Sequence, residues 1–183
     1  MVWLRIDVDN PCYYHPIFIR LRLRWNVPIP GYYKPTRETL AFLKSKYPEL
    51  RRIWFIRSII LPPRDLLKGE EIGLHVTNPM NILKEYAKVT SWFDRSISYY
   101  TRHGHSKIAS GKVWTEEEKK YVRSVLPNLE DLSDKPHHTI TRLPDQPSRV
   151  DFRGIDHILF HDVHFRIARR ELEEVLERVA SSA

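Results

Sequence analysis

The first strand-like segment of this 183-residue chain carries two carboxylates on one face and apolar side chains on the other. It reads LRIDVDNP, and the side chains of an extended strand alternate between its two faces. Asp7 and Asp9 therefore share a face with Arg5, while Leu4 and Ile6 share the opposite one. In a (β/α) barrel, such an apolar face packs under helices, and the polar tip at the carboxyl end opens into the active site.

Three later apolar runs also end in a residue that can carry a proton or bind a metal. They read EIGLH, SISYYTRH and HILFH, and they close at His75, His103 and His161. Imidazole is a common ligand for Zn²⁺ and titrates close to neutral pH. Four strand ends that each deliver a carboxylate or an imidazole predict a barrel enzyme with a metal site.

Strand-like and helical patterns alternate along most of the chain. We expect strands over 2–8, 52–58, 71–76, 96–101, 138–141 and 157–161, and helices over 36–47, 79–89, 115–126 and 166–180. Two of these helices are expected to carry an apolar stripe, formed in 79–89 by Ile82, Leu83, Tyr86 and Val89 and in 166–180 by Ala168, Leu172, Val175, Leu176 and Val179. The third helix opens on a capping box formed by Thr115 and Glu118. This alternation predicts an α/β fold, a compact, distorted (β/α) barrel with fewer than eight regular units, because roughly 250 residues are typical of a full barrel.

The segment 126–153 is rich in Pro, Asp, Ser and His, and we expect it to form an irregular excursion beside a substrate cleft. His137 and His138 fall in this segment and are expected to form a solvated loop pair.

Composition predicts one domain over 1–183, without repeats or a low-complexity linker. The single cysteine, Cys12, excludes an intramolecular disulfide. The pattern of a signal peptide is missing, as is a long apolar run, so we expect a cytoplasmic protein without a membrane partner. Few Gly, many Pro and abundant Arg also suit a thermophile.

The net charge of +7 raises the question of a nucleic-acid partner. The basic residues are scattered, however, and the densest clusters are 20–25 and 50–57. A solvated row of Arg side chains on an outer strand explains the first cluster better than a nucleic-acid groove does, so a nucleic-acid partner is not expected.

Each candidate residue also has a structural interpretation. Asp7 can pair with Arg5 on the same face. Asn78 followed by Pro79 is typical of a helix cap and a first helical residue, which argues against Asn78 as a metal ligand. The pair His103 and His105 leaves two choices for a third ligand beside Asp9 and His75; His103 is preferred and His105 is the alternative.

His161 has two interpretations. It follows Leu159 on one face, an apolar setting suited to a general acid. Alternatively, it hydrogen-bonds Asp162 or the backbone at the barrel rim.

The segments LRIDVDNP, EIGLHVTNP, YYTRHG and HILFHD, in this order, resemble the NodB-homology polysaccharide deacetylases, in particular divergent members that open on Asp-Val-Asp. The resemblance implies a distorted (β/α) barrel that uses one divalent metal ion, usually Zn²⁺, to hydrolyse N-acetyl groups or other C–N bonds. It implies that Asp7 is the catalytic base and Asp9 the metal-binding carboxylate. His75 resembles the first metal-binding His, and Leu159 with His161 resemble the late pair whose His is the general acid.

The chain departs from the family pattern after His75. The family has a second ligand His three or four residues later, where this chain has Asn78 and Pro79. From strand position we assign that role to His103. Arg57 and Arg102, near predicted strand ends, are the candidates for a substrate-positioning Arg.

The sequence thus predicts a metal-dependent hydrolase of a C–N bond, acting on an acetylated carbohydrate or a small amide. Two alternatives stay open: a catalytically inactive relative that serves as a binding or scaffold protein, and a basic nucleic-acid-binding protein. The oligomeric state is not predicted.

Overall fold

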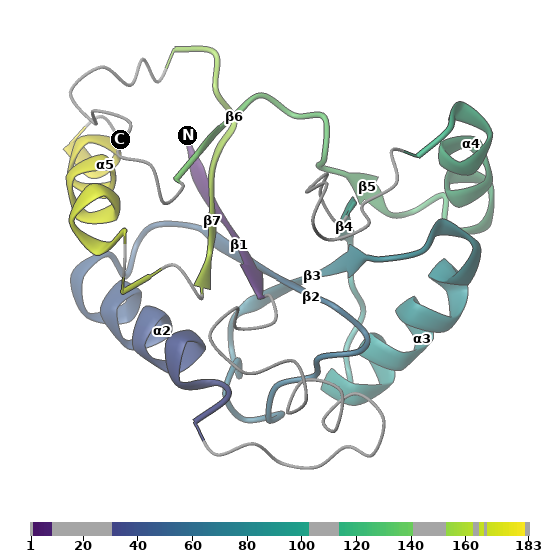
Figure 1. Ribbon diagram of the computed structural model, residues 1–183, viewed down its shortest axis with the longest axis horizontal. Helices are drawn as coiled ribbons and strands as arrows, with labels where there is room; N and C mark the ends of the chain where they lie inside the picture. Colours follow the sequence, from purple (N-terminus) through teal and green to yellow (C-terminus); the bar gives the residue numbers. More distant parts are fainter. Residues whose placement is uncertain are drawn as a thin grey trace. The chain divides into compact units, whose positions relative to one another are not determined.

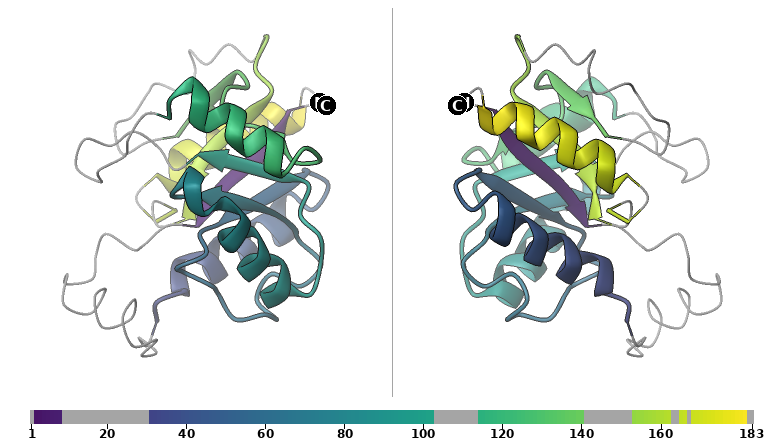
Figure 2. Two further views of the ribbon diagram at one scale, coloured as in Figure 1. Left: turned by 90° about the vertical axis from the view of Figure 1, so that its right-hand side faces the viewer. Right: turned by 90° about the vertical axis from the view of Figure 1, so that its left-hand side faces the viewer.

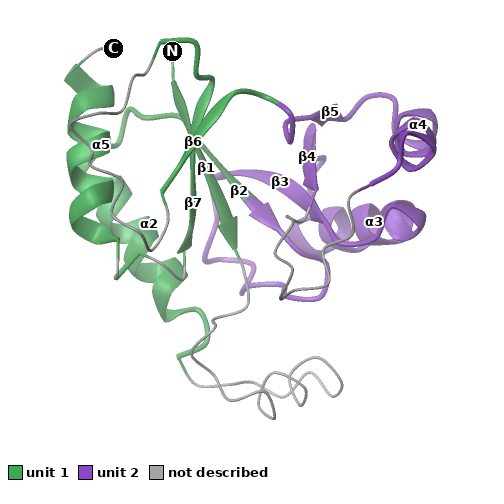
Figure 3. Ribbon diagram, turned by 45° about the horizontal axis from the view of Figure 1, so that its top comes forward, with its two compact units in different colours: residues 1–54, 135–183 green, residues 55–134 purple. Residues whose placement is uncertain are grey.

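The computed structural model describes residues 2–8, 31–102, 114–140, 153–162, 165–166 and 168–181 (Figure 1). The chain divides into two compact units (Figure 3). Unit 1 comprises residues 1–54 and 135–183, and unit 2 comprises residues 55–134. The sequence prediction of one domain over 1–183 stays a prediction.

The strands of the described residues form one sheet. They are β1 (Trp3–Val8), β2 (Arg52–Ile56), β3 (Glu71–Val76), β4 (Tyr99–Arg102), β5 (Glu130–Asp131), β6 (His137–Thr139) and β7 (His157–His161). Their order is β5-β4-β3-β2-β1-β7-β6, and the pairs β1–β7, β6–β7, β3–β4 and β4–β5 run parallel. Parallel strands joined through helices define an α/β fold, so the predicted class, with fewer than eight regular units, is confirmed.

In unit 1, two helices lie side by side on the same side of the β1–β7 pair (Figures 1 and 2). They are α2 (Lys34–Lys46) and α5 (Arg169–Ser181). Every second residue of β1, at Leu4, Ile6 and Val8, is a buried apolar residue. The predicted apolar stripe of the last helix is confirmed by its buried residues, Leu172, Val175, Leu176 and Val179. Apolar faces of strand and helix thus build the core of this unit.

The carboxyl end of β7 is tied to the first turn of α2. This helix begins without a side-chain cap and without an acidic residue in its first turn. Instead, the buried carboxylate of Asp162 accepts a hydrogen bond of 2.5 Å from the Thr36 hydroxyl. A negative charge is favourable at a helix N-terminus. Asp162, at the end of β7, therefore supplies the negative charge that the first turn of α2 lacks.

Unit 2 contains three more helical elements: the 3₁₀-helix η1 (Pro79–Asn81), α3 (Ile82–Phe93) and α4 (Glu116–Val125). Helix α3 contacts β3, and η1 contacts α4. Within β3, Gly73 leaves room for a neighbouring ring, because a Cβ atom there would lie 2.3 Å from a ring carbon of Phe55. Only glycine fits this position without moving Phe55.

The predicted capping box of α4 is confirmed. The Thr115 hydroxyl accepts from the Glu118 backbone N–H at 3.2 Å, and the Glu118 carboxylate accepts from the Thr115 N–H at 2.8 Å. Two otherwise unpaired backbone donors are satisfied reciprocally, so this helix start is specified by local sequence alone.

The structure corrects three predictions. The pattern over 79–89 forms η1 and then α3, and Leu83, expected on the apolar stripe, is 49% exposed while Glu85 is buried. The segment 126–153 was expected to be irregular apart from a strand over 138–141; its described part contains that strand as β6 and also β5, which was not expected. His137 and His138 therefore belong to a strand and not to a solvated loop.

Within the described part of the chain, no helix has the length and apolar character that a membrane crossing requires.

Candidate active site

The centre of the candidate site is a buried ion pair on one face of β1. The Arg5 guanidinium donates from Nε to Asp7 Oδ1 at 3.0 Å and from Nη2 to Asp7 Oδ2 at 2.9 Å. Arg5 is 5% exposed and Asp7 2% exposed. Such a two-point contact fixes the carboxylate plane as well as its position. It also compensates a negative charge that would be costly to bury alone.

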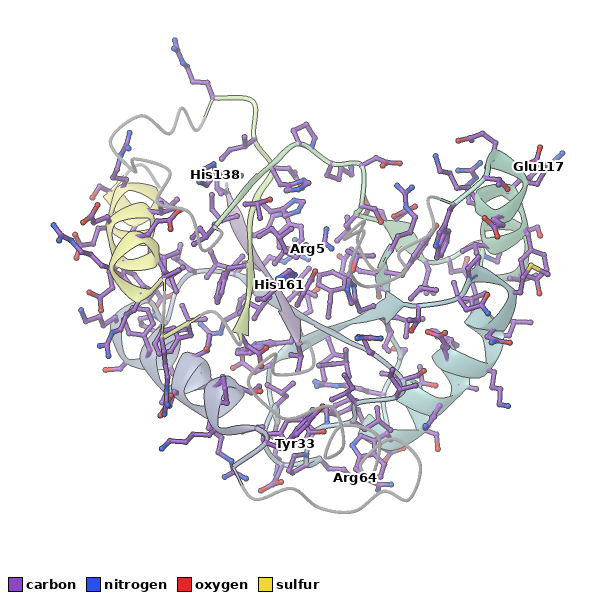
Figure 4. All side chains as sticks on the ribbon, in the orientation of Figure 1. Arg5, Tyr33, Arg64, Glu117, His138 and His161 are labelled. Carbon is purple, nitrogen blue, oxygen red and sulfur yellow. The ribbon has the colours of Figure 1, made fainter. Side chains whose placement is uncertain are left out.

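His161 lies beside this ion pair on the neighbouring strand. The parallel register of β1 and β7 places Asp7 opposite His161. The His161 Nε2 is 3.8 Å from Asp7 Oδ2, which is ion-pair range but longer than a hydrogen bond. Figure 4 labels Arg5, which comes from β1, and His161, which comes from β7. The imidazole is 29% exposed, so it can reach a bound substrate as well as the carboxylate.

Leu159 lies in register with Arg5, two residues before His161. It is 8% exposed and extends the same strand face. The Asp7–His161 contact therefore has an apolar neighbour on the β7 side. Its predicted substrate contact stays a prediction.

His75, the predicted first metal ligand, lies in β3 of unit 2 and is 1% exposed. Its Nδ1 is 2.8 Å from the Thr101 hydroxyl of the neighbouring strand β4. In the tautomer that donates this Nδ1 proton to Thr101, Nε2 carries the lone pair that a metal ion needs. A hydrogen bond on the nitrogen away from the metal is the usual arrangement for a ligating His. The contact of His75 therefore fits a ligand role.

Asn78, at the place of the family's second His, has a structural role. Its side-chain oxygen accepts from the Met80 N–H at 3.0 Å and caps η1, in which Pro79 is the first residue. The structural interpretation of the Asn-Pro pair is confirmed. The amide oxygen is already used by the backbone of its own turn.

Glu85 of α3 holds the same turn from the other side. Its carboxylate accepts from the backbone N–H groups of Thr77 and Asn78, both at 3.2 Å. Burial raises the pKa of Glu85, against these hydrogen bonds and the charge of Arg57, which lower it. The sequence predicted an apolar stripe on this helix and gave no signal for a buried carboxylate.

Arg102, one of the two candidate substrate-positioning residues, is 8% exposed at the end of β4. Its Nε lies 3.4 Å from Asp131 Oδ2, and its Nη2 contacts the carboxylate of Asp134. Its backbone N–H donates to the Ser133 hydroxyl at 2.8 Å. The other candidate, Arg57, follows β2 and is half-buried. The structure thus fixes Arg102 by protein carboxylates, and both substrate roles stay predictions.

The remaining predicted ligands, Asp9, His103 and His105, lie outside the described residues. Within the residues that are described, no group of three or more His, Cys, Asp or Glu side chains could hold a metal ion. Of the predicted metal ligands, the structure therefore describes His75 alone, and the other ligands stay predictions.

A second histidine on β7, His157, was not singled out by its sequence. It is completely buried, and its ring stacks on Trp3 at 4.5 Å and on His137 at 5.0 Å between centroids. Burial, assisted by the charge of Arg5, lowers the pKa of His157 to about 4. This imidazole is therefore neutral at pH 7 and serves as part of the core.

Comparison with known proteins shows which solved structures have a fold similar to that of this chain. No family model matches the chain, and the curated proteins contain no match. Among solved structures, the polysaccharide deacetylase Bc1974 from Bacillus cereus has a TM-score of 0.60 at 15% identity, with 100% of this chain and 88% of that chain covered. BA3943, a CE4 family pseudoenzyme from Bacillus anthracis, has a TM-score of 0.57 at 12% identity, with coverage of 97% and 61%.

A mutant of BA3943 with restored enzymatic activity has a TM-score of 0.57 at 10% identity, with coverage of 97% and 63%. This chain thus spans less than two thirds of the BA3943 structures. The chain has the fold of the polysaccharide deacetylases, and the resemblance predicted from its sequence motifs is confirmed at the level of the fold.

Proposed function

We propose that this protein hydrolyses a carbon–nitrogen bond and removes the acyl group from an acetylated sugar or a related small amide. The observation that carries the proposal is the contact between Asp7 and His161 at the carboxyl ends of two neighbouring parallel strands. Active sites of barrel enzymes lie at this end of the strands. The fold shared with polysaccharide deacetylases supports the same reaction class.

The two side chains divide the proton transfers between them. Asp7, held by Arg5, takes a proton from the water whose oxygen attacks the acyl carbon. His161, partly exposed beside Asp7, gives a proton to the nitrogen as the C–N bond breaks. The products are a carboxylic acid and a free amine, so the proton that enters at Asp7 and the proton that leaves from His161 balance.

Asp9, His75 and His103 would hold one divalent ion, with Zn²⁺ as the expected metal and His105 as the alternative to His103. Such an ion supplies a Lewis acid that polarises the acyl oxygen and lowers the pKa of a bound water. His75 supports this assignment through its Nδ1 contact with the Thr101 hydroxyl, the kind of second contact that a ligating His usually makes.

The test is metal content combined with turnover. Protein purified without chelator or affinity tag is analysed by elemental mass spectrometry, as wild type and as Asp9→Asn and His75→Ala. We expect about one divalent ion per chain in the wild type, a loss in both variants, and acetate release from N-acetylated sugars or small amides. A wild type that takes up no Zn²⁺, Co²⁺ or Mn²⁺ when these are in excess contradicts the proposal.

A second function has its own supporting observation. The Asn78 side-chain oxygen caps η1 and is therefore not available as a metal ligand in place of the family's second His. One of the similar structures is a pseudoenzyme. The alternative is thus an inactive deacetylase-like protein that binds its ligand without hydrolysis. Saturable binding of an N-acetylated sugar without acetate release, in metal-loaded protein, would favour it.

A further inference from the structure

Arg5 and Asp7 come from the same strand, two residues apart, so their side chains project from one face of β1. The local chain alone brings the guanidinium to the carboxylate. Both oxygens of Asp7 receive a donor, at 3.0 Å and 2.9 Å. Two contacts restrict the rotation of the carboxylate about its last bond, a rotation that is otherwise broad. These two hydrogen bonds from Arg5 therefore determine the direction in which each oxygen of Asp7 points.

One of the two Asp7 oxygens held by Arg5 also lies beside His161, the proposed general acid. Oδ2 accepts from Arg5 Nη2 and also lies 3.8 Å from His161 Nε2. A rotation of the carboxylate would change this separation. The orientation of Asp7 towards His161 is thus coupled to the contact with Arg5.

The neighbours of Arg5 favour this contact. On β7 its partner in register is Leu159, which has no charge to compete for the guanidinium. At the amino end of the same face, Trp3 and the neutral ring of His157 are stacked on each other. Asp7 supplies Arg5 with a carboxylate at 2.9 Å.

Resting on the proposed function, we propose that Arg5 is a positioning residue whose two-point grip holds the Asp7 carboxylate in the orientation that receives the water proton beside His161. A lysine cannot reproduce this grip, because its ammonium is a point charge without the planar fork. Charge and geometry can therefore be separated by substitution.

The kinetic test compares Arg5→Lys and Arg5→Gln with Ile6→Val. Ile6 is fully buried on the opposite face of β1, so its variant reports a general loss of packing in the same strand. We expect kcat to fall about a hundredfold in both Arg5 variants, since a small misplacement of a reacting group costs about that much, with KM unchanged. Ile6→Val should keep the wild-type kcat. A wild-type kcat in Arg5→Lys would overturn the inference.

The structural test does not depend on turnover. Crystal structures of the wild type, Arg5→Lys and Arg5→Gln compare the side-chain rotamer of Asp7 and its distance from His161. We expect a rotated carboxylate in both variants, and an unmoved carboxylate in Arg5→Lys overturns the inference. If the wild type shows no turnover, the proposed function fails while the rotamer comparison still decides the role of Arg5. If Arg5→Gln does not fold, Arg5→Lys, which keeps the charge, carries both tests.

Discussion

The two ends of the β1–β7 pair use histidine in opposite ways. At the amino end, His157 is completely buried, stacks on Trp3 and has its pKa lowered to about 4. At the carboxyl end, four residues later, His161 is 29% exposed and lies 3.8 Å from the Asp7 carboxylate. Both belong to the same strand face and the same parallel register. Burial makes one imidazole a neutral part of the core, whereas a neighbouring carboxylate and partial exposure of its own ring suit the other to the proposed proton transfer.

This difference teaches that residue type alone does not separate a core histidine from one at the proposed site. The neighbours across the strand pair do. Trp3 faces His157 and Asp7 faces His161, and these partners come from a strand about 150 positions earlier in the chain. The following experiments test whether the two ends are as different as their surroundings indicate.

The largest effect is expected from Asp7→Asn. An amide cannot take the water proton, so kcat/KM should fall by about 10³, within the range typical of a general base. The metal content should stay at the wild-type level, since Asp7 is not among the predicted ligands. Steady-state kinetics and elemental analysis on the same preparation check both points, with circular dichroism to confirm that the variant is folded. Loss of the metal in this variant would contradict the base assignment.

A smaller loss is expected from His161→Gln. The variant keeps polar volume but cannot protonate the leaving amine, so kcat should fall by about 10². The thermal midpoint should change less than in His157→Gln, because the His161 ring is 29% exposed and the His157 ring is completely buried. His157→Gln is the matched control at the other end of the pair and should lose stability in preference to turnover. An equal loss of stability in His161→Gln and His157→Gln would contradict the difference between the two ends of the β1–β7 pair.

The buried His157, at the amino end of the β1–β7 pair, predicts that the free energy of unfolding depends on pH. The pKa of His157 is about 4 in the folded protein, and the usual pKa of an exposed imidazole is 6.5, so the unfolded chain binds more protons between these two values. The free energy of unfolding should therefore fall as the pH decreases from about 6.5 to about 4. The loss is on the order of 3 kcal/mol, from 1.36 kcal/mol per pKa unit.

Urea denaturation at several pH values measures this dependence. His157→Phe keeps a planar ring without a titratable group, so the difference between its stability curve and that of the wild type isolates the contribution of His157. Parallel curves for the two proteins between pH 7 and pH 4 would show that His157 is not the group responsible.

The smallest effect is expected from Trp3→Phe. The Trp3 indole Nε1–H donates to Asp156 at 3.0 Å, and phenylalanine keeps a ring against His157 without this donor. We expect a loss of about 1 kcal/mol in the free energy of unfolding, the usual net contribution of one hydrogen bond. Because this end is remote along the strand from Asp7, kcat should stay at the wild-type value. A large fall in kcat would mean that the two ends are coupled.

The parts of the fold that were predicted correctly depend on neighbours in sequence. Alternation placed Arg5 and Asp7 on one face of β1, and the four-residue signal at Thr115 and Glu118 located the start of α4. The apolar stripe of α5 also follows from local periodicity. Such features are local, so a single sequence is enough to specify them.

What could not be predicted depends on long-range pairing. The two residues of β5 are too short for a period to show, and they become a strand through β4. Glu85 interrupts an apolar stripe because its partners are backbone N–H groups of the preceding turn, which leave no trace in residue type. At the site, Thr101 as the partner of His75 likewise emerges only once β3 and β4 pair.

The cap at Asn78 has a consequence for any variant that places a histidine at this position. Replacing Asn78 by His would introduce an imidazole, but it would remove the side-chain oxygen that accepts the Met80 N–H. A single substitution would therefore add an imidazole and at the same time remove one of the contacts that hold the turn, while the contacts from Glu85 would stay. Evolution or engineering towards a complete ligand set would need a paired change, with a new acceptor for Met80 in place before, or together with, the new histidine.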